Sequence, residues 1–380
     1  MRAYRLSKES EFDKIFSKLG VTKEGSLILQ KKANLNFIYI KELRSPAANI
    51  LKQDALSLGA DLAVPKNCVT CSEKFVDAIL IANDMQLKTL SKKEKIQPFG
   101  LKDLASQISS LATKKREKTK IMGVLNANSD SFFQDSRFSA KNAEEKIQKM
   151  IDDGADIIDI GGVSSRPGSV GVSEEEEFER VKEIISLVGK EKFYQQVEFS
   201  LDSYSTLSLK YALDNGFGII NDITALHSDS VAKLAADYNA TVVLMHKLGT
   251  TKDMQKNPTY QSVMLEIDDF FAQRVAKAKS FGIKKIVLDV GIGFGKRLEH
   301  NLELLHNLEH FLHFGYPLLV GASRKSMIDM IVPTKTEDRL PGTIALHLEA
   351  MKNGASILRV HDVKEHIQAV KIQEALMESF

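Results

Sequence analysis

Eight short apolar segments follow one another after residue 118, and a stretch of helical periodicity follows each of them. This alternation predicts a TIM (β/α)₈ barrel, in which each helix returns the chain to start the next parallel strand. Residues 118–380 number 263, close to the ~250 that such a barrel usually needs. The predicted strands are Ile121–Leu125, Ile157–Ile160, Val197–Leu201, Gly218–Ile220, Thr241–Met245, Ile286–Leu288, Leu318–Val320 and Ser356–Val360.

A nucleotide-binding open sheet also alternates strands with helices, and a glycine-rich loop would distinguish it. The candidate loop here is Gly291–Lys296, with the sequence GIGFGK. Lys296 stands where the dinucleotide fingerprint needs its third glycine, and Arg297 stands where a P-loop needs Ser or Thr. We therefore expect these glycines to shape a loop after the sixth barrel strand. The predicted helices include Asn142–Asp152, Glu174–Val188, Leu207–Asn215 and Ser262–Phe281.

Residues 1–115 are predicted to form a separate small α/β domain, which the charged tract Lys114–Lys120 links to the barrel domain at 118–380. The expected helices are Lys8–Leu19, Ala47–Leu58 and Leu101–Leu111, and the expected strands are Ser26–Leu29 paired with Asn36–Ile40, together with Ala78–Ala82. No catalytic constellation is visible in this part, so its function is not predicted.

Charge is unevenly divided along a chain whose formal net charge is +2. Residues 1–120 have 23 Lys+Arg against 13 Asp+Glu, a net of +10, and the remainder has 29 against 37, a net of −8. A basic module can indicate nucleic-acid binding, but these lysines are scattered among apolar residues without a known motif. We expect no nucleic-acid partner, and favour packing of the basic module on the acidic one or an oligomer contact.

The two cysteines and the hydropathy of the chain indicate in which cellular compartment the protein resides. Cys68 and Cys71 could form half of a zinc site or a redox pair. A structural zinc site needs about four ligands, and no second Cys/His cluster stands nearby, so two reduced thiols are expected. No apolar run approaches the ~18 residues of a membrane span, and the charged N-terminus lacks a signal core. We predict a cytoplasmic protein without membrane contact.

Polar residues stand at nearly every predicted strand end, the end that forms the active-site face of this barrel. Asp202, Asn221, Asp289 and Lys325 combine carboxylates, an amide and a cation. A strand-end carboxylate can accept paired N–H groups from an amino-pyrimidine edge, and the amide and ammonium suit carbonyl and ring nitrogen atoms. These four residues predict a site for a flat heterocycle with alternating donors and acceptors, such as a pterin.

A second strand-end set comprises Asn126, Arg166, Arg359 and His361. Guanidinium, imidazole and amide groups that converge on one face predict a phosphate or diphosphate site. Asn126 and Asp130 could add oxygen ligands for Mg²⁺ shared with the phosphate. We regard Asp222, His246 and Asp362 as structural partners. His300, His306, His310 and His313 have the spacing of a solvated face, without open metal geometry.

From Ile121 onward the chain resembles the dihydropteroate synthase family, whereas the N-terminal ~115 residues lie outside the resemblance. The motifs that carry it are Met122–Asn126 with Asp130–Phe132, Gly161–Gly162 with Ser165–Gly168, Asp202, Ile220–Asp222, Leu244–His246, Leu288–Asp289 with Gly293–Lys296, Gly321 with Ser323–Ser326, and Arg359–Asp362.

The resemblance implies that 6-hydroxymethyl-dihydropterin pyrophosphate and p-aminobenzoate are joined, with Mg²⁺ and release of pyrophosphate, by a dissociative displacement. It also implies a homodimer. Pterin would bind Asp202, Asn221, Asp289 and Lys325 beside Phe294 and Met245. Pyrophosphate would bind Asn126, Arg166, Arg359 and His361, with metal at Asn126 and Asp130. Phe132, Ser165, Arg166, Pro167 and Ser323 would border p-aminobenzoate. Asn126, Arg359, His361, Lys325 and Asp202 would be catalytic.

The chain departs from the family pattern in two loops. Ala127–Ser129 replaces the usual Val-Thr-Pro, Gln134 stands where an acidic residue is expected, and Val163 replaces the glutamate of the second loop. These changes leave open a catalytically silent pterin-binding paralogue or interaction protein. A pterin-dependent methyltransferase domain, which shares the barrel and its carboxylates, is a further alternative. The residues expected on the pyrophosphate side, Ser323–Ser326 and Arg359–Asp362, argue against the methyltransferase.

Overall fold

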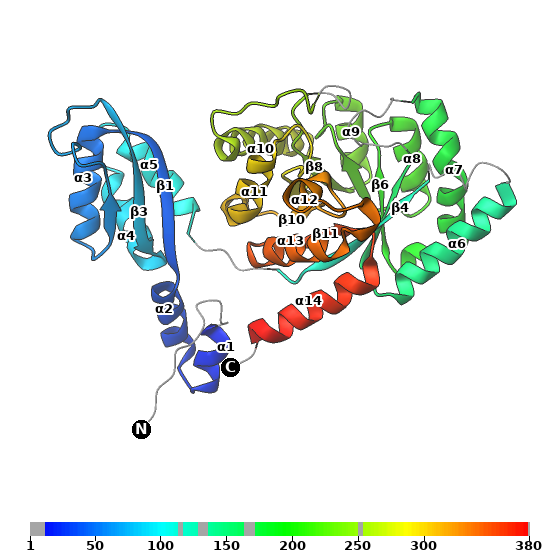
Figure 1. Cartoon of the computed structure of the whole chain (residues 1–380), viewed down its shortest axis with the longest axis horizontal. Coiled ribbons are helices and arrows are strands. Elements are labelled where there is room, and N and C mark those ends of the chain that lie inside the picture. The colour runs from blue at the N-terminus through cyan, green and yellow to red at the C-terminus, as the bar shows by residue number, and fades with distance from the viewer. Residues whose placement is uncertain (1–11, 113–116, 128–135, 163–171, 250–253, 379–380) are drawn as a thin grey trace. The chain divides into compact units, whose positions relative to one another are not determined.

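The computed structural model describes residues 12–112, 117–127, 136–162, 172–249 and 254–378 (Figure 1). The chain divides into two compact units, residues 1–115 with 374–380 and residues 116–373. Among the described residues, no helix combines the length and the apolar composition needed to cross a membrane.

The larger unit is a closed barrel of eight parallel strands, so the predicted fold class is confirmed (Figure 1). Its strands are β4 (Lys120–Asn126), β5 (Ile157–Gly161), β6 (Glu198–Asp202), β7 (Ile219–Asp222), β8 (Thr241–Met245), β9 (Lys285–Asp289), β10 (Leu318–Val320) and β11 (Ile357–Val360). The surrounding helices are α6 (Ser136–Asp152), α7 (Glu174–Lys190), α8 (Thr206–Asp214), α9 (Asp229–Asp237), α10 (Val263–Ser280), α11 (Leu298–His306), α12 (Ser326–Ile331), α13 (Leu340–Lys352) and α14 (Val363–Glu378), with short 3₁₀ turns η2 (Phe193–Gln195), η3 (Leu308–Phe314) and η4 (Thr336–Asp338).

The interior of the barrel is packed rather than hollow. One buried apolar side chain from each of seven strands forms a single cluster, comprising Met122, Ile157, Ile219, Val243, Val287, Leu319 and Ile357. Strands covered on both faces read as continuous apolar runs, which is why the sequence located all eight. Because this apolar cluster fills the interior of the barrel, polar side chains from different strands can meet at the strand ends.

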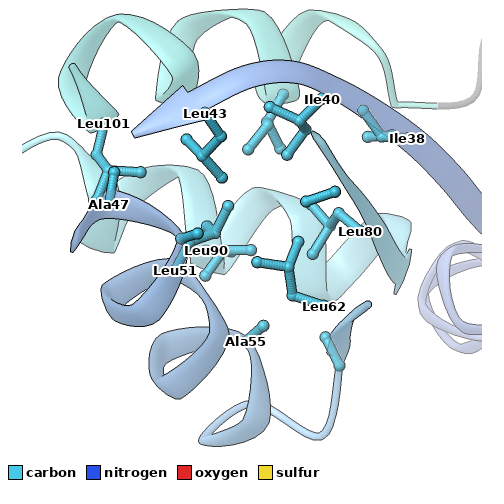
Figure 2. Close-up of a cluster of buried hydrophobic side chains, with 14 of the residues drawn as sticks. Ile38, Ile40, Leu43, Ala47, Leu51, Ala55, Leu62, Leu80, Leu90 and Leu101 are labelled. Atoms are coloured by element: carbon cyan, nitrogen blue, oxygen red, sulfur yellow. The ribbon is translucent and has the colours of Figure 1, made fainter. Parts of the chain in front are cut away.

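The smaller unit has a three-stranded antiparallel sheet in the order β1 (Leu35–Arg44), β3 (Phe75–Asn83) and β2 (Asp61–Ala63). Its helices are α1 (Phe12–Lys18), α2 (Lys23–Ala33), α3 (Ser45–Leu56), α4 (Asp84–Glu94) and α5 (Leu101–Ser110). Alternate residues of β1 and β3 are buried, and Figure 2 shows Ile40 and Leu80 of the sheet in one cluster with Leu51 of α3 and Leu90 of α4. One face of this sheet therefore holds the core of the unit.

The strand predicted at Ser26–Leu29 is wrong, because these residues lie inside α2. Thr22 caps that helix by accepting the N–H of Gly25, and the flanking lysines, glutamate and glutamine favour a helix over a strand. The predicted strand at Asn36–Ile40 forms within β1 but pairs with β3 instead. Helix α4, which begins with a capping box between Asn83 and Gln86, was missed.

Candidate active site

Strand register places the predicted residues at one level of the barrel. Asn126 of β4 is opposite Gly161 of β5, Gly161 is opposite Asp202 of β6, and Asp202 is opposite Asn221 of β7. Asn126 and Asp202 are the last residues of their strands and Asn221 is the last but one, so these three side chains meet at the carboxyl-terminal mouth.

Arg359 of β11 reaches across this mouth to two carboxylates. Its Nε donates to Oδ2 of Asp159 at 2.7 Å, and its Nη2 donates to Oδ2 of Asp202 at 2.9 Å. The Nδ2 of Asn221 donates to the same Asp159 oxygen at 3.2 Å. Two carboxylates thus share one guanidinium, and Arg359 connects the two residue sets that the sequence treated as separate.

Burial at the mouth of the barrel shifts the pKa values of two strand-end carboxyl groups. Burial raises the pKa of Asp202 to about 7, with the attraction of Arg359 opposing the shift and the charge of Asp159 adding to it. Burial also raises the pKa of Asp289, against a hydrogen bond donated to it by the N–H of Gly291. The mouth therefore holds carboxyl groups whose protonation responds to whatever donor binds them.

Lys325 and Phe294 form the opposite side of the mouth. The ammonium of Lys325 lies 4.1 Å from the centroid of the Phe294 ring, a cation–π contact. Phe294 belongs to one buried apolar cluster with Met245, Ile223 and Met254. Apolar and aromatic surface beside strand-end carboxylates is the environment that suits a flat heterocycle.

Two glycines let the loop after β9 approach its neighbours closely. Gly291 has φ +68°, and a Cβ added there would lie 2.0 Å from the carbonyl oxygen of His246. Gly293 has φ +82°, and its Cβ would lie 3.3 Å from Cδ of Lys325. A side chain at position 291 would push the loop off the His246 backbone, whereas one at position 293 would press on the Lys325 side chain, and both would be strained because L residues rarely adopt this φ.

The buried side chain of Lys296 holds the loop after β9 through hydrogen bonds to its backbone. Its buried Nζ donates to the carbonyl oxygens of Gly291 at 3.0 Å and Phe294 at 3.1 Å, and it lies 2.9 Å from Nδ1 of His246. Burial, reinforced by the charge of Lys296, lowers the pKa of His246, so this imidazole is neutral and accepts from the lysine. The structural role predicted for His246 is confirmed.

The ends of β10 and β11 are joined by a second network. Ser323 Oγ accepts the backbone N–H of His361 at 3.3 Å and lies 2.9 Å from its Nδ1. A hydroxyl that donates to Nδ1 is compatible with the tautomer that carries the ring proton on Nε2. Arg324 donates to both oxygens of Asp362 at 3.0 and 2.7 Å, which confirms the structural role expected of Asp362.

A cavity of about 480 Å³ opens beside Asn126 and His361. Its lining includes Lys146 and Lys149 together with the acidic residues Asp153, Asp362 and Glu365, and Lys149 pairs with Asp153 at 2.5 Å. The lining thus mixes cationic and acidic side chains, so the cavity is not a site of net positive charge.

The profile of the pterin binding enzyme family matches residues 122–361, more than half of the chain. This chain belongs to the pterin-binding enzyme family. The bifunctional dihydropteroate synthase/dihydropteroate reductase of Helicobacter pylori is 43% identical over 347 residues, 91% of each chain. The dihydropteroate synthase of Escherichia coli K12 is 40% identical over 260 residues, 68% of this chain and 91% of the relative.

Solved structures agree with this family. The dihydropteroate synthase of Yersinia pestis with a sulfonamide drug complex is 38% identical with a TM-score of 0.63, over 69% of this chain and 95% of that chain. The Thermus thermophilus enzyme in complex with 4-aminobenzoate is 34% identical with a TM-score of 0.61, over 68% and 95%. The E. coli and structural matches span about the length of a barrel, whereas the H. pylori match of 347 residues exceeds it and reaches the N-terminal unit.

Several residues predicted for this pterin-binding site fall outside the described residues. They are Asp130, Phe132, Ser165, Arg166 and Pro167. The structure brings together Asn126, Asp202, Asn221, Asp289, Lys325 and Arg359 at the mouth, with Phe294, Met245, Ser323 and His361 beside them. Asp222 is structural as predicted, because its oxygens accept the N–H groups of Thr224 and Leu226 at 2.7 and 2.8 Å.

Sequence reasoning missed Asp159, which pairs with Arg359 and is fully buried in β5. A lone carboxylate inside the apolar run Ile157–Ile160 was the available signal, because an unpaired charge is costly inside a strand buried on both faces.

The histidines expected on a solvated face are not all there. His300 is buried and accepts the backbone N–H of Arg297 at 3.2 Å, and His310 and His313 are half-buried against Asp268, whereas His306 is exposed. The η3 turn directs His310 and His313 inward, which the spacing alone did not reveal.

Proposed function

We propose that this chain is a dihydropteroate synthase of folate biosynthesis. It joins 6-hydroxymethyl-7,8-dihydropterin pyrophosphate to p-aminobenzoate and releases pyrophosphate. The supporting observation is the hydrogen-bonded cluster of Asp159, Arg359, Asp202 and Asn221 at the mouth of a pterin-family barrel.

Pterin recognition falls to the buried polar groups. The ionised Asp202 accepts N–H groups of the amino-pyrimidine edge, Asn221 offers both a donor and an acceptor, and Asp289 accepts with its remaining oxygen. Lys325 donates to a carbonyl or ring nitrogen, while Phe294 flanks the ring. A ligand without this edge would leave buried groups unpaired at a cost of ~1–3 kcal/mol each, so selectivity follows.

The reaction then requires a leaving group to depart. The methylene C–O bond breaks, and its electron pair leaves with the diphosphate, while the electron-rich dihydropterin delocalises the positive charge that remains. The amine of p-aminobenzoate forms the new C–N bond with its lone pair and then loses a proton. No covalent bond to the enzyme is needed, so the protein contributes orientation and charge stabilisation.

His361 stabilises the departing diphosphate in this scheme. Ser323 supports the tautomer that presents Nε2–H as a donor to the diphosphate. The diphosphate role of Arg359 stays a prediction, since two of its nitrogens already donate to carboxylates.

Magnesium fits the donors beside the cavity at Asn126 and His361. Hard Mg²⁺ prefers oxygen and commonly shares phosphate oxygens and water with only one or two protein ligands. Asn126 offers an amide oxygen at the cavity, Asp130 is the second predicted ligand, and bound Mg²⁺ would neutralise charge on the leaving diphosphate. The p-aminobenzoate contacts of Phe132, Ser165, Arg166, Pro167 and Ser323 also stay predictions, as do the homodimer and the cytoplasmic location.

Product formation tests the proposal. Purified protein given both substrates and Mg²⁺ should form dihydropteroate, and removal of Mg²⁺ by a chelator should stop it. Calorimetric pterin binding without any product would support the silent paralogue instead. Methyl transfer from a pterin to a corrinoid would support the methyltransferase.

A second activity is favoured by the length of the H. pylori match, because that bifunctional relative covers the N-terminal unit as well. Dihydropteroate reduction would add a hydride to C6 and a proton to N5 of the pterin, with a reduced nicotinamide or flavin as the donor. Oxidation of that donor on addition of dihydropteroate tests this activity. Synthase turnover without donor oxidation would leave the first proposal intact and remove the second.

A further inference from the structure

A group of titratable side chains lies outside the strand-end cluster, where α10 meets the η3 turn. Both imidazoles of η3 point at one carboxylate oxygen: Nε2 of His310 lies 3.0 Å and Nε2 of His313 lies 2.5 Å from Oδ1 of Asp268. The three candidate ligand atoms all lie within 4.8 Å of one another. Two separate elements thus converge on a single point.

The local backbone explains the convergence. A 3₁₀ helix has three residues per turn, so side chains three positions apart are eclipsed. His310 and His313 are related in this way within Leu308–Phe314, and they leave η3 on the same side. An α-helical turn would have rotated the two rings apart by ~60°, because its period is 3.6 residues.

Aromatic packing fixes the two rings. The His313 ring lies 4.0 Å from that of Phe314, and the His310 ring lies 5.1 Å from that of Phe311. Both phenylalanines make edge contacts with Phe271, which stands on the same helix as Asp268. Helix α10, which supplies the carboxylate of Asp268, therefore also holds the two imidazoles in place through apolar contacts.

We propose that Asp268, His310 and His313 bind a divalent transition metal of the Zn²⁺ class, with water as the fourth ligand. Two imidazoles and one carboxylate are a donor set that suits Zn²⁺ and its neighbours, in contrast to the oxygen donors that suit Mg²⁺. The side chains are 16–26% exposed, which leaves a side open for water. Tetrahedral coordination needs ligand atoms about 3.3 Å apart, so a small rotation of the carboxylate admits the ion.

The bound metal would link α10 to η3, because its protein ligands come from both elements. The carboxylate gives the site a negative charge when both imidazoles are neutral, and a bound ion replaces the hydrogen bonds that now join the three side chains. Because the ion binds only the folded arrangement, it should raise the melting temperature, and the rise should grow with the logarithm of the ion concentration above its Kd.

Cobalt(II) is the probe for this site, since four-coordinate Co²⁺ absorbs strongly in the visible range. Chelator-treated full-length protein should gain such a band with Co²⁺, and Zn²⁺ should abolish it by competition. His313→Gln should weaken Co²⁺ affinity at least about tenfold, whereas His313→Cys should keep metal binding because a thiolate is also a ligand.

His306→Gln is the matched control, because His306 is exposed on the adjacent helix and should leave the band unchanged. Asp268→Asn provides a second test if His313→Gln fails to fold. The proposal is overturned if the wild-type protein shows no four-coordinate band, or if the band persists with unchanged affinity in a folded His313→Gln or Asp268→Asn variant.

Discussion

Asp159 Oδ2 lies 2.6 Å from Nη2 of Arg359, although the two residues stand 200 positions apart in the chain. The carboxylate is fully buried, and Arg359 extends from it to Asp202. Asp159 therefore positions the guanidinium that orients a residue expected to bind pterin.

Replacement of Asp159 tests this positioning role. Asp159→Asn should lower pterin affinity at least about tenfold, or ~1.4 kcal/mol, because Arg359 is then free to move away from Asp202. Calorimetry with a pterin measures the effect. Asp156→Asn is the control, since Asp156 precedes the same strand, accepts the N–H of Ile121 at 2.8 Å and can still accept as an amide. Equal affinities in the two variants would contradict the role of Asp159.

The raised pKa of Asp202 predicts a pH dependence. In the folded chain its pKa is about 7, against an ordinary value of 3.8. The folded state therefore binds more protons between these values, and the contribution of Asp202 to the free energy of unfolding falls as the pH rises through that window. Pterin affinity should change in the opposite direction, increasing up to about pH 7, because the ionised carboxylate is the better acceptor.

Calorimetry across this pH range measures the affinity, and Asp202→Asn should flatten the profile since an amide does not titrate. A profile that keeps its full slope in Asp202→Asn would assign the titration to another group or to the ligand.

Substitution of Gly293 tests whether pterin binding needs the close contact between Lys325 and the loop after β9. Gly293→Ala should lower pterin affinity about threefold to tenfold, because the new Cβ meets Lys325 and displaces its ammonium. Gly282→Ala is a matched control: Gly282 has φ +83°, like the +82° of Gly293, and an added Cβ has nothing within 4 Å. Both variants should lose similar stability in thermal unfolding. Normal pterin binding by a folded Gly293→Ala would refute this contact.

Ser323 should act through His361. Ser323→Ala removes the hydroxyl bonded to Nδ1, so kcat should fall about fivefold to tenfold while KM for the pterin substrate stays nearly constant. Ser323→Thr should restore most of the rate. A change in KM for p-aminobenzoate alone would instead support the border role that the family resemblance implies.

The barrel could be predicted because its strands are buried on both faces and read as eight separate apolar runs. The strand prediction at Ser26–Leu29 was wrong because a run of three apolar residues does not distinguish a strand from a helix, and the N-cap at Thr22 starts helix α2. The residues at the predicted strand ends include most of those at the mouth of the barrel. They do not reveal which of these side chains pair with one another. That Arg359 contacts Asp159 and Asp202 depends on register and side-chain reach around the closed barrel.

Pyrophosphate release, measured with and without p-aminobenzoate in the presence of Mg²⁺, tests synthase activity most directly. The wild-type protein should release pyrophosphate faster when p-aminobenzoate is supplied, and Asp202→Ala should lose both pterin binding and release. Absence of p-aminobenzoate-dependent release from folded wild-type protein would rule out synthase activity, and undiminished release by Asp202→Ala would rule out the pterin-binding role of Asp202.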